Sequence, residues 1–196
     1  MRLLIVRHGE TEYNTKKIFQ GIINEKLNQN GIDQANKLSV RLKDEKIDLI
    51  FSSTLDRAKK TAEIINKYHN LEIQFKDELK EKNFGDLQGK PWKKLIEIVK
   101  KSGVEFHKYK PRNGESGVEA QKRIINFLNK ILEKYPEKTV LFVTHGAVIM
   151  ELLFHLTKLP RSESKKIEQN NTALNIIEID TNKHKIHLIN CTNHLD

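Results

Sequence analysis

Short apolar runs alternate along the chain with longer segments in which apolar residues recur every three or four positions. The apolar runs lie at residues 3–6, 47–51 and 140–143. Runs of this kind, without regular polar positions, are typical of strands that are covered on both faces. The periodic segments lie at residues 28–43, 54–67, 119–134 and 147–156. Their spacing predicts helices, and the alternation predicts an α/β domain with a largely parallel sheet.

The C-terminal part of the chain has a different pattern. Residues 173–180 (ALNIIEID) and 183–190 (KHKIHLIN) are rich in isoleucine and leucine, and only Thr181 and Asn182 separate them. Two such runs joined by a short polar turn predict a pair of antiparallel strands. We therefore expect the sheet to end in an antiparallel edge.

Residues 79–118 are the least regular part of the chain. Glycine and proline residues interrupt this segment, and a basic helical stretch occupies about residues 92–101. Irregular segments of this kind often cover a site that a rigid scaffold carries. We interpret residues 79–118 as a small lid within a single domain that spans residues 1–196.

Composition narrows the class of protein. The formal net charge is +9, but the lysines are spread through the predicted helices and form no basic tract with interleaved aromatic residues. This pattern disfavours nucleic-acid binding and favours small anionic ligands, which a positive surface attracts. No apolar run approaches the length of about 18 residues that a membrane span needs. Because Cys191 is the single cysteine, an internal disulfide is excluded, and we expect a cytoplasmic protein.

Basic and imidazole side chains follow three of the predicted strands. Arg7 and His8 come directly after the first strand, and His145 follows the strand at 140–143. Arg57 lies in the first turn of the helix after the second strand, where the helix dipole disfavours a cation by about 0.3–1 kcal/mol. Because the carboxyl ends of parallel strands meet at one edge of the sheet, we expect these four side chains to lie together.

Two arginines and two histidines in one pocket are suited to phosphoryl transfer. Planar guanidinium groups bind a phosphate dianion in bidentate fashion, and a neutral imidazole can attack phosphorus to form a phosphohistidine. A general acid is also needed, because an alkoxide leaves poorly without a proton. Glu81 is one candidate, since it lies in a glycine-containing loop after a further predicted strand at residues 72–75. A bound phosphate would favour the protonated form of its carboxyl group.

Five motifs, in this order, resemble those of the histidine phosphatase superfamily. They are LLIVRHGETEYN (3–14), FSSTLDRAKKTAE (51–63), LKEKNFGDLQGK (79–90), NGES (113–116) and LFVTHGAVI (141–149). The resemblance is to the branch that contains cofactor-dependent phosphoglycerate mutases and small-molecule phosphatases. It implies a three-layer α/β/α sandwich, a mainly parallel sheet, and hydrolysis that requires neither a metal ion nor an organic cofactor.

The resemblance also implies roles for individual residues. His8 matches the phosphorylated nucleophile, and Arg7, Arg57 and His145 match the phosphate pocket. Glu81 matches the proton donor of the family. Further positions that match the lining of the pocket are Asn14, Gln20, Gly21 and Gly146.

The chain departs from the family pattern in two places. After FQG the family often has an aspartate and then a proline-leucine-threonine run, whereas this chain has Asn24 and Lys26 in the corresponding loop. Before GES the family often has another glycine, which is Asn113 here.

The length of the lid bears on whether the reaction is hydrolysis or isomerisation. Mutases of this family typically have a longer insertion between the acid motif and the GES motif, whereas this chain has only residues 90–113 there. We therefore favour a phosphatase that acts on a small anionic phosphorylated metabolite, with a phosphoglycerate mutase as the alternative. A non-catalytic module that binds a phosphorylated ligand is an alternative of another class, which the complete set of core residues disfavours.

Several residues leave alternatives open. Phe84, Trp92 and Phe106 either pack within the lid or contact the substrate. The basic residues of the lid either bind a second anionic group or are simply exposed. They are Lys90, Lys93, Lys94, Lys108, Lys110 and Arg112. His184 and His187 are interpreted as part of a solvated edge rather than as metal ligands, and this edge could pair two subunits in a homodimer.

Overall fold

The computed structural model describes residues 1–180 and 184–196. The strands are β1 (Arg2–Arg7), β2 (Leu49–Ser53), β3 (Ile73–Lys76), β4 (Thr139–Thr144), β5 (Leu174–Ile179) and β6 (His184–Cys191). The α-helices are α1 (Glu12–Thr15), α2 (Gln29–Leu42), α3 (Asp56–Asn66), α4 (Trp92–Ser102), α5 (Gly117–Lys134) and α6 (Gly146–Thr157). The 3-10 helices are η1 (Asp77–Leu79), η2 (Gly85–Leu87) and η3 (Arg161–Ile167). The predicted turn at Thr181 and Asn182 lies outside the described residues.

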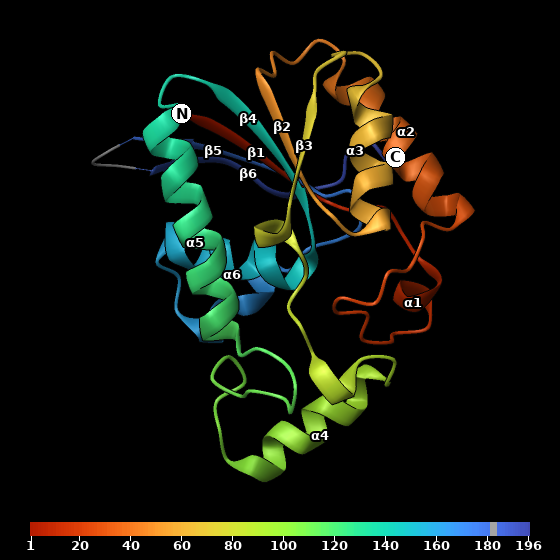
Figure 1. The fold of residues 1–196 in the computed structure, drawn as a ribbon, viewed down its shortest axis with the longest axis vertical. Helices are drawn as coiled ribbons and strands as arrows, with labels where there is room; N and C mark the ends of the chain where they lie inside the picture. The colour runs from red at the N-terminus through yellow and green to blue at the C-terminus, as the bar shows by residue number, and fades with distance from the viewer. Residues whose placement is uncertain (181–183) are drawn as a thin grey trace.

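The strands form one six-stranded sheet in the order β3-β2-β4-β1-β5-β6. Strands β3, β2, β4 and β1 pair in parallel, whereas β5 pairs antiparallel with β1 and with β6 (Figure 1). The predicted mainly parallel sheet with an antiparallel edge is thus confirmed. In the parallel register, Arg7 of β1 lies opposite Thr144 of β4, so the segments that follow these two strands start side by side.

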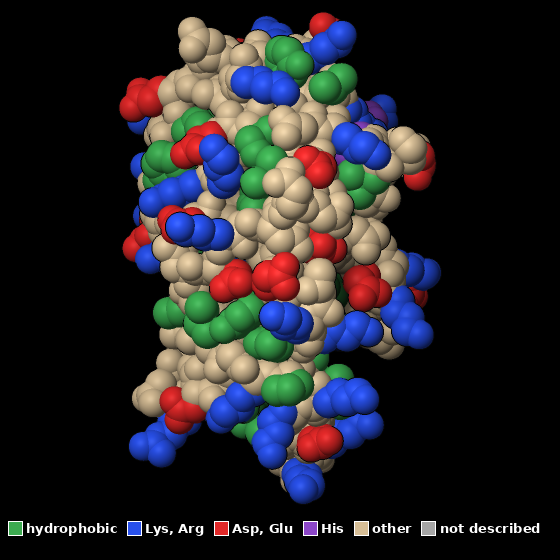
Figure 2. Space-filling model, turned by 90° about the vertical axis from the view of Figure 1, so that its right-hand side faces the viewer, with side chains coloured by type: hydrophobic (Ala, Val, Ile, Leu, Met, Phe, Trp, Pro, Cys, Tyr) green, Lys and Arg blue, Asp and Glu red, His purple; other side chains and the backbone are tan. Residues whose placement is uncertain are grey.

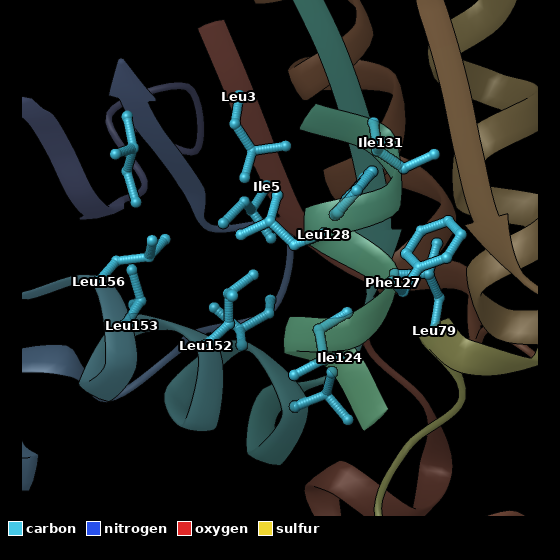
Figure 3. Packing of buried hydrophobic residues seen from close by; sticks show 14 of the residues in the cluster. Leu3, Ile5, Leu79, Ile124, Phe127, Leu128, Ile131, Leu152, Leu153 and Leu156 are labelled. Atoms are coloured by element: carbon cyan, nitrogen blue, oxygen red, sulfur yellow. The ribbon is translucent and has the colours of Figure 1, made fainter. Parts of the chain in front are cut away.

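Apolar side chains cover the two faces of the sheet alternately. Leu3 and Ile5 of β1 belong to the cluster that packs against α5 and α6, whereas Leu4 and Val6 belong to the cluster that packs against α2 and α3. Figure 3 shows Leu128 of α5 lying against Leu3 and Ile5. The burial of each such side chain contributes about 1.5–3 kcal/mol. Both faces of an apolar run are therefore covered, and the predicted three-layer α/β/α sandwich is confirmed.

The helices differ in how their first turns are capped. The Asn28 side chain caps α2, and Ser116 and Glu119 form a reciprocal capping box at the start of α5. Helices α3 and α6 begin after Leu55 and His145, neither of which makes a side-chain capping bond. The free N–H groups at the start of such helices can bind other acceptors, including anions.

Residues 79–118, here called the lid segment, lie beyond the carboxyl ends of the parallel strands, with α4 far from the sheet (Figure 1). The lid segment has an apolar cluster of its own. Its buried side chains are Phe84, Leu87, Leu95 and Val99. Phe19 and Ala147 pack against this cluster, so the lid segment contacts both the region after α1 and the start of α6. These contacts place it over the ends of the strands.

Charged side chains are distributed over the surface rather than gathered in one tract. Figure 2 shows basic and acidic side chains interspersed over one face, with several basic ones at the lower end, where the lid segment lies in Figure 1. In the described part of the chain, no helix is both long enough and apolar enough to cross a membrane.

Candidate active site

The four side chains that follow the parallel strands converge on one point. The rings of His8 and His145 lie with their centroids 5.1 Å apart. The Arg57 Nε–H group lies between them and donates to His8 Nε2 at 3.3 Å and to His145 Nδ1 at 3.2 Å. Arg7 lies at the carboxyl end of β1, next to His8 in the chain. The structure therefore brings together the four side chains that were expected to meet because each follows a parallel strand.

The hydrogen bonds of the two histidines define their tautomers. His8 Nδ1 lies 2.7 Å from the carbonyl oxygen of Gly9, which can only accept, so Nδ1 carries the proton and Nε2 carries a lone pair. His145 Nδ1 accepts from Arg57, and His145 Nε2 lies 2.8 Å from Ser53 Oγ. His145 therefore donates from Nε2 to Ser53. Both rings are held from the side that faces away from Arg57.

Burial and neighbouring cations keep both histidines neutral. The pKa of His8 is well below its usual value, chiefly because the ring is buried and also because Arg57 and Arg7 are close. The pKa of His145 is lowered in the same way, first by burial and then by Arg57. An imidazole with a free Nε2 lone pair at neutral pH is the form that a nucleophile needs.

These lowered pKa values predict how stability depends on pH. An unfolded histidine takes up a proton near pH 6.5, whereas folded His8 does not, so the unfolded state binds more protons as the pH falls. We expect His8 alone to lower the free energy of unfolding by about 1 kcal/mol between pH 6.5 and 5.5. Urea unfolding at these two pH values should show a smaller decrease for His8→Asn than for the wild type. Equal decreases would show that folded His8 titrates normally.

The two arginines are held by backbone carbonyl groups rather than by carboxylates. Arg57 is fully buried and donates from Nη1 to Ile23 O and from Nη2 to Gly21 O, both at 2.7 Å. Burial lowers its pKa to about 10, so it stays charged. Arg7 Nη1 donates to Gln169 O at 2.6 Å, while its buried Nε has no hydrogen-bond partner among the described residues. Two cations without a bound carboxylate make this a site for an anion.

Glu81 lies at the start of α6, beside the same pocket. Its carboxylate accepts hydrogen bonds from the N–H groups of Ala147 and Val148, at 3.2 and 3.3 Å, and from the N–H of Lys82 at 2.8 Å. The uncapped first turn of α6 thus binds this carboxylate. Glu81, which matches the proton donor of the family, thus lines the same pocket as Arg7, His8 and Arg57, and its role stays a prediction.

An ion pair between Arg123 and Glu115, which the sequence analysis did not predict, lies beside the loop that carries Glu81 and helps to hold it. Arg123 of α5 donates from Nη1 to the carbonyl groups of Glu78 and Lys80, at 2.7 and 2.9 Å. The same guanidinium binds Glu115 at 2.6 Å. Glu115 belongs to the NGES motif, to which the sequence analysis assigned no role. A charged residue in such a motif was the signal in the sequence that could have indicated this pair. The pair ties the start of the lid segment to α5.

Arg7, His8, Arg57 and Glu81 line a pocket of about 320 Å³. The further predicted positions that line it are Asn14, Gln20, Gly21 and Gly146. His145 does not itself line the pocket, but it is fully buried against Arg57 and His8, which do line it.

The segment before β5 contributes residues that the sequence analysis missed. Glu168 and Gln169 line the pocket, and Asn171 donates to the backbone oxygen of His8 at 3.0 Å. No periodicity or motif marks these positions in the sequence, because they reach the site only through the fold.

The two departures from the family pattern have structural explanations. Asn24 Oδ1 accepts a hydrogen bond from the N–H of Asp56 at 2.8 Å, so it caps the first turn of α3. Lys26 is exposed and does not line the pocket. Asn113 has a φ of 57°, a left-handed conformation that glycine adopts freely and asparagine tolerates. Neither departure alters the residues around His8.

The alternatives left open for the lid segment are now resolved in part. Phe84 is buried in the lid cluster and also lines the pocket, where Trp92 and Phe106 are partly exposed. The six basic residues considered above are exposed, and none lines the pocket. At the other end of the sheet, His187 contacts Glu178 at 3.2 Å. Within residues 1–180 and 184–196, no three His, Cys, Asp or Glu side chains are grouped to hold a metal ion.

The fold and the site define an α/β protein with an anion pocket at the carboxyl ends of its parallel strands. The family model of the histidine phosphatase superfamily (branch 1) matches residues 3–192. The chain therefore belongs to this superfamily, as its five motifs indicated.

Individual relatives agree with this assignment. The chain is similar to a Bacillus subtilis (strain 168) protein named uncharacterized phosphatase PhoE, with 37% identity over 97% of this chain and 95% of the relative. It is also similar to phosphoglycerate mutase-like protein 4 of Arabidopsis thaliana, with 32% identity over 99% of this chain and 86% of the relative. Among solved structures, a mutant phosphoserine phosphatase from Entamoeba histolytica in complex with phosphoserine has a TM-score of 0.86 and 29% identity, and the match covers 99% and 98% of the two chains.

Proposed function

We propose that this protein is a phosphatase that hydrolyses small phosphate monoesters through a phosphohistidine on His8. The observation that carries the proposal is the state of His8, which is neutral, held at Nδ1 by Gly9 O, and has its Nε2 lone pair beside Arg57. The Arg57 Nε–H bond to Nε2 is shared with His145 and is long, so a phosphate oxygen can replace Nε2 as its acceptor. Replacement frees the lone pair for attack.

The proposed reaction has two steps. Glu81 enters the first step in its protonated form, which a bound phosphate favours. His8 Nε2 then forms a bond to phosphorus, the bond to the ester oxygen breaks, and Glu81 gives that oxygen its proton. Arg7 and Arg57 hold the other phosphate oxygens and stabilise the charge that develops on them. In the second, water attacks phosphorus, the bond from phosphorus to His8 Nε2 breaks, and Glu81 takes a proton from the water. Phosphate leaves and neutral His8 is restored.

Hydrolysis is favoured over isomerisation by the short, open lid segment. Trp92 and Phe106, which line the pocket, are 38% and 53% exposed, so the lid side of the pocket is open to water. A mutase must keep water away until a second acceptor reaches the phosphohistidine. The phosphoglycerate mutase is the second candidate, because one relative is named mutase-like.

A panel of phosphate esters tests the proposal. We expect the purified protein to release inorganic phosphate from phosphoserine, 3-phosphoglycerate or an aryl phosphate without added metal. Isomerisation of 3-phosphoglycerate without release of phosphate would instead identify a mutase. Tight binding of phosphate esters without turnover would identify a non-catalytic binding module.

Other parts of the sequence analysis stay predictions. They are the roles of Asn14, Gln20, Gly21, His145 and Gly146 in binding phosphate, the single domain over residues 1–196, the cytoplasmic location and the homodimer.

A further inference from the structure

A second cavity adjoins the pocket around His8. Its volume is about 730 Å³, which is more than twice the 320 Å³ of the pocket. The two share one wall, made by Phe84, Phe106, Ala147 and Met150. We call the second one the side cavity. A phosphate group does not need this volume, which lies in the range of sites for larger organic ligands.

The side cavity adjoins the part of the pocket where Glu81 lies. Glu81, the proposed proton donor to the leaving oxygen, lines the pocket, and the next residue, Lys82, lines the side cavity. Ala147 lies in the shared wall and also donates its N–H to the Glu81 carboxylate. An alcohol bound with its oxygen near Glu81 can therefore extend into the side cavity.

Lys82 is an unusual residue in the wall of this cavity. Lys82 is only 4% exposed. Its ammonium nitrogen lies over the rings of Phe84 and Phe106, 5.3 and 5.8 Å from the ring centres. No described residue forms a hydrogen bond or an ion pair with this ammonium group. Burial lowers the pKa of Lys82, as expected for a cation removed from water. The ammonium nitrogen itself is not fully buried and faces the side cavity, where a bound anion can accept hydrogen bonds from it.

The other charged groups of the side cavity already have partners. Glu151 binds Arg161 through two hydrogen bonds of 2.8 and 2.6 Å, and the same guanidinium stacks on Phe154, 4.1 Å from the ring centre. Glu105 pairs with Lys108 at 3.0 Å. Among the described residues, Lys82 is therefore the charged group of this wall without a hydrogen bond or ion pair, although nearby carboxylates, Glu151 first, partly oppose the effect of burial on its pKa. Phe84, Phe106 and Phe154 make much of the rest of the wall apolar.

We propose that the side cavity binds the leaving-group part of the substrate, an alcohol with an apolar body and an anionic substituent that contacts Lys82. The inference rests on the proposed phosphatase function and adds a substrate class to it. The apolar body lies against the phenylalanine side chains, and the anion accepts hydrogen bonds from the Lys82 ammonium group. Charge-assisted hydrogen bonds of this kind are among the stronger polar interactions in proteins.

Three aryl phosphates with similar leaving groups test the inference. They are 4-methylphenyl phosphate, 4-(carboxymethyl)phenyl phosphate and 4-(aminomethyl)phenyl phosphate. For the wild type we expect kcat/KM to be at least about tenfold higher for the carboxymethyl ester than for the methyl ester, mainly through KM. The aminomethyl ester should be the poorest substrate. In Lys82→Met the ratio between the carboxymethyl and methyl esters should fall to near one, whereas Lys82→Arg should retain most of it.

Lys94→Met is the matched control, because Lys94 is an exposed lysine of the same lid segment and lines neither cavity. It should keep the wild-type ratio. An unchanged ratio in Lys82→Met, or no preference in the wild type, would overturn the inference while the phosphatase function stands. Loss of all three activities in Lys82→Met would assign Lys82 a structural role and overturn it as well. If the wild type releases phosphate from none of the esters, the proposed function itself fails.

Discussion

Replacing His8 by alanine should reduce kcat for every phosphate ester by at least about 10⁴-fold, because removal of a covalent nucleophile disables both steps of the reaction. Among the described residues that line the pocket, His8 is the one histidine, and none is a cysteine, serine or threonine. His145 lies behind Arg57 and does not line the pocket, and its Nε2 donates to Ser53. Any residual rate should come from direct attack of water on a phosphate that Arg7 and Arg57 still bind.

Release of inorganic phosphate and trapping of the phosphoenzyme should be measured together. The wild type should form a phosphoenzyme that is labile in acid and stable in alkali, as expected for phosphohistidine, and His8→Ala should form none. His187→Ala is the control, because His187 lies on β6, at the far end of the sheet order. Circular dichroism should show an unchanged fold in both variants. Normal turnover in His8→Ala, or a trapped phosphoenzyme in that variant, would refute the mechanism.

Replacing Glu81 by glutamine should give a loss that depends on the leaving group. Glutamine has nearly the same shape, and its one oxygen can still accept from the N–H groups of Lys82 and Val148, which both donate to Oε1, but its amide group cannot give a proton to an alkoxide. We expect kcat/KM for phosphoserine to fall by about 10²–10⁴-fold. The fall for 4-nitrophenyl phosphate should be much smaller, since nitrophenolate leaves without a proton.

The second step gives an independent readout of the same variant. Without a base to activate water, Glu81→Gln should release one equivalent of nitrophenol rapidly and further equivalents slowly, while the phosphoenzyme accumulates. Glu168→Gln is the matched comparison, because Glu168 is the other glutamate that lines the pocket. A burst and a leaving-group effect in Glu168→Gln, with neither in Glu81→Gln, would reassign the general acid.

The parts of the molecule that could be predicted from the sequence have local or topological causes. Apolar runs such as residues 3–6 identify buried strands, because a strand covered on both faces tolerates no regular polar position. Once the strands are identified, the parallel topology itself brings His8, Arg57 and His145 together. The motifs then added Glu81, which spacing alone could only propose.

The remaining features depend on contacts between segments without periodicity. Lys82 lies between Lys80 and Lys90 in the sequence, and nothing in the sequence distinguishes it from the exposed lysines of the lid segment. Its burial follows from where Phe84 and Phe106 lie in the fold. Likewise, the bond from Asn171 to the backbone of His8 joins residues 163 positions apart. Such contacts are consequences of tertiary structure and have no local signal.

The way Arg57 is held has a consequence for anyone who wishes to capture the natural substrate. Its guanidinium group donates to the carbonyl groups of Gly21 and Ile23, and its removal would leave the buried Gly21 carbonyl without that partner, at a cost of about 1–3 kcal/mol. An inactive variant with Arg57 replaced would thus lose a contact that holds the loop at residues 21–23 as well as losing activity. His8 makes no such bond to a distant segment through its side chain apart from the one with Arg57. A substrate trap for fishing the physiological ester out of a cell extract is therefore best built at His8.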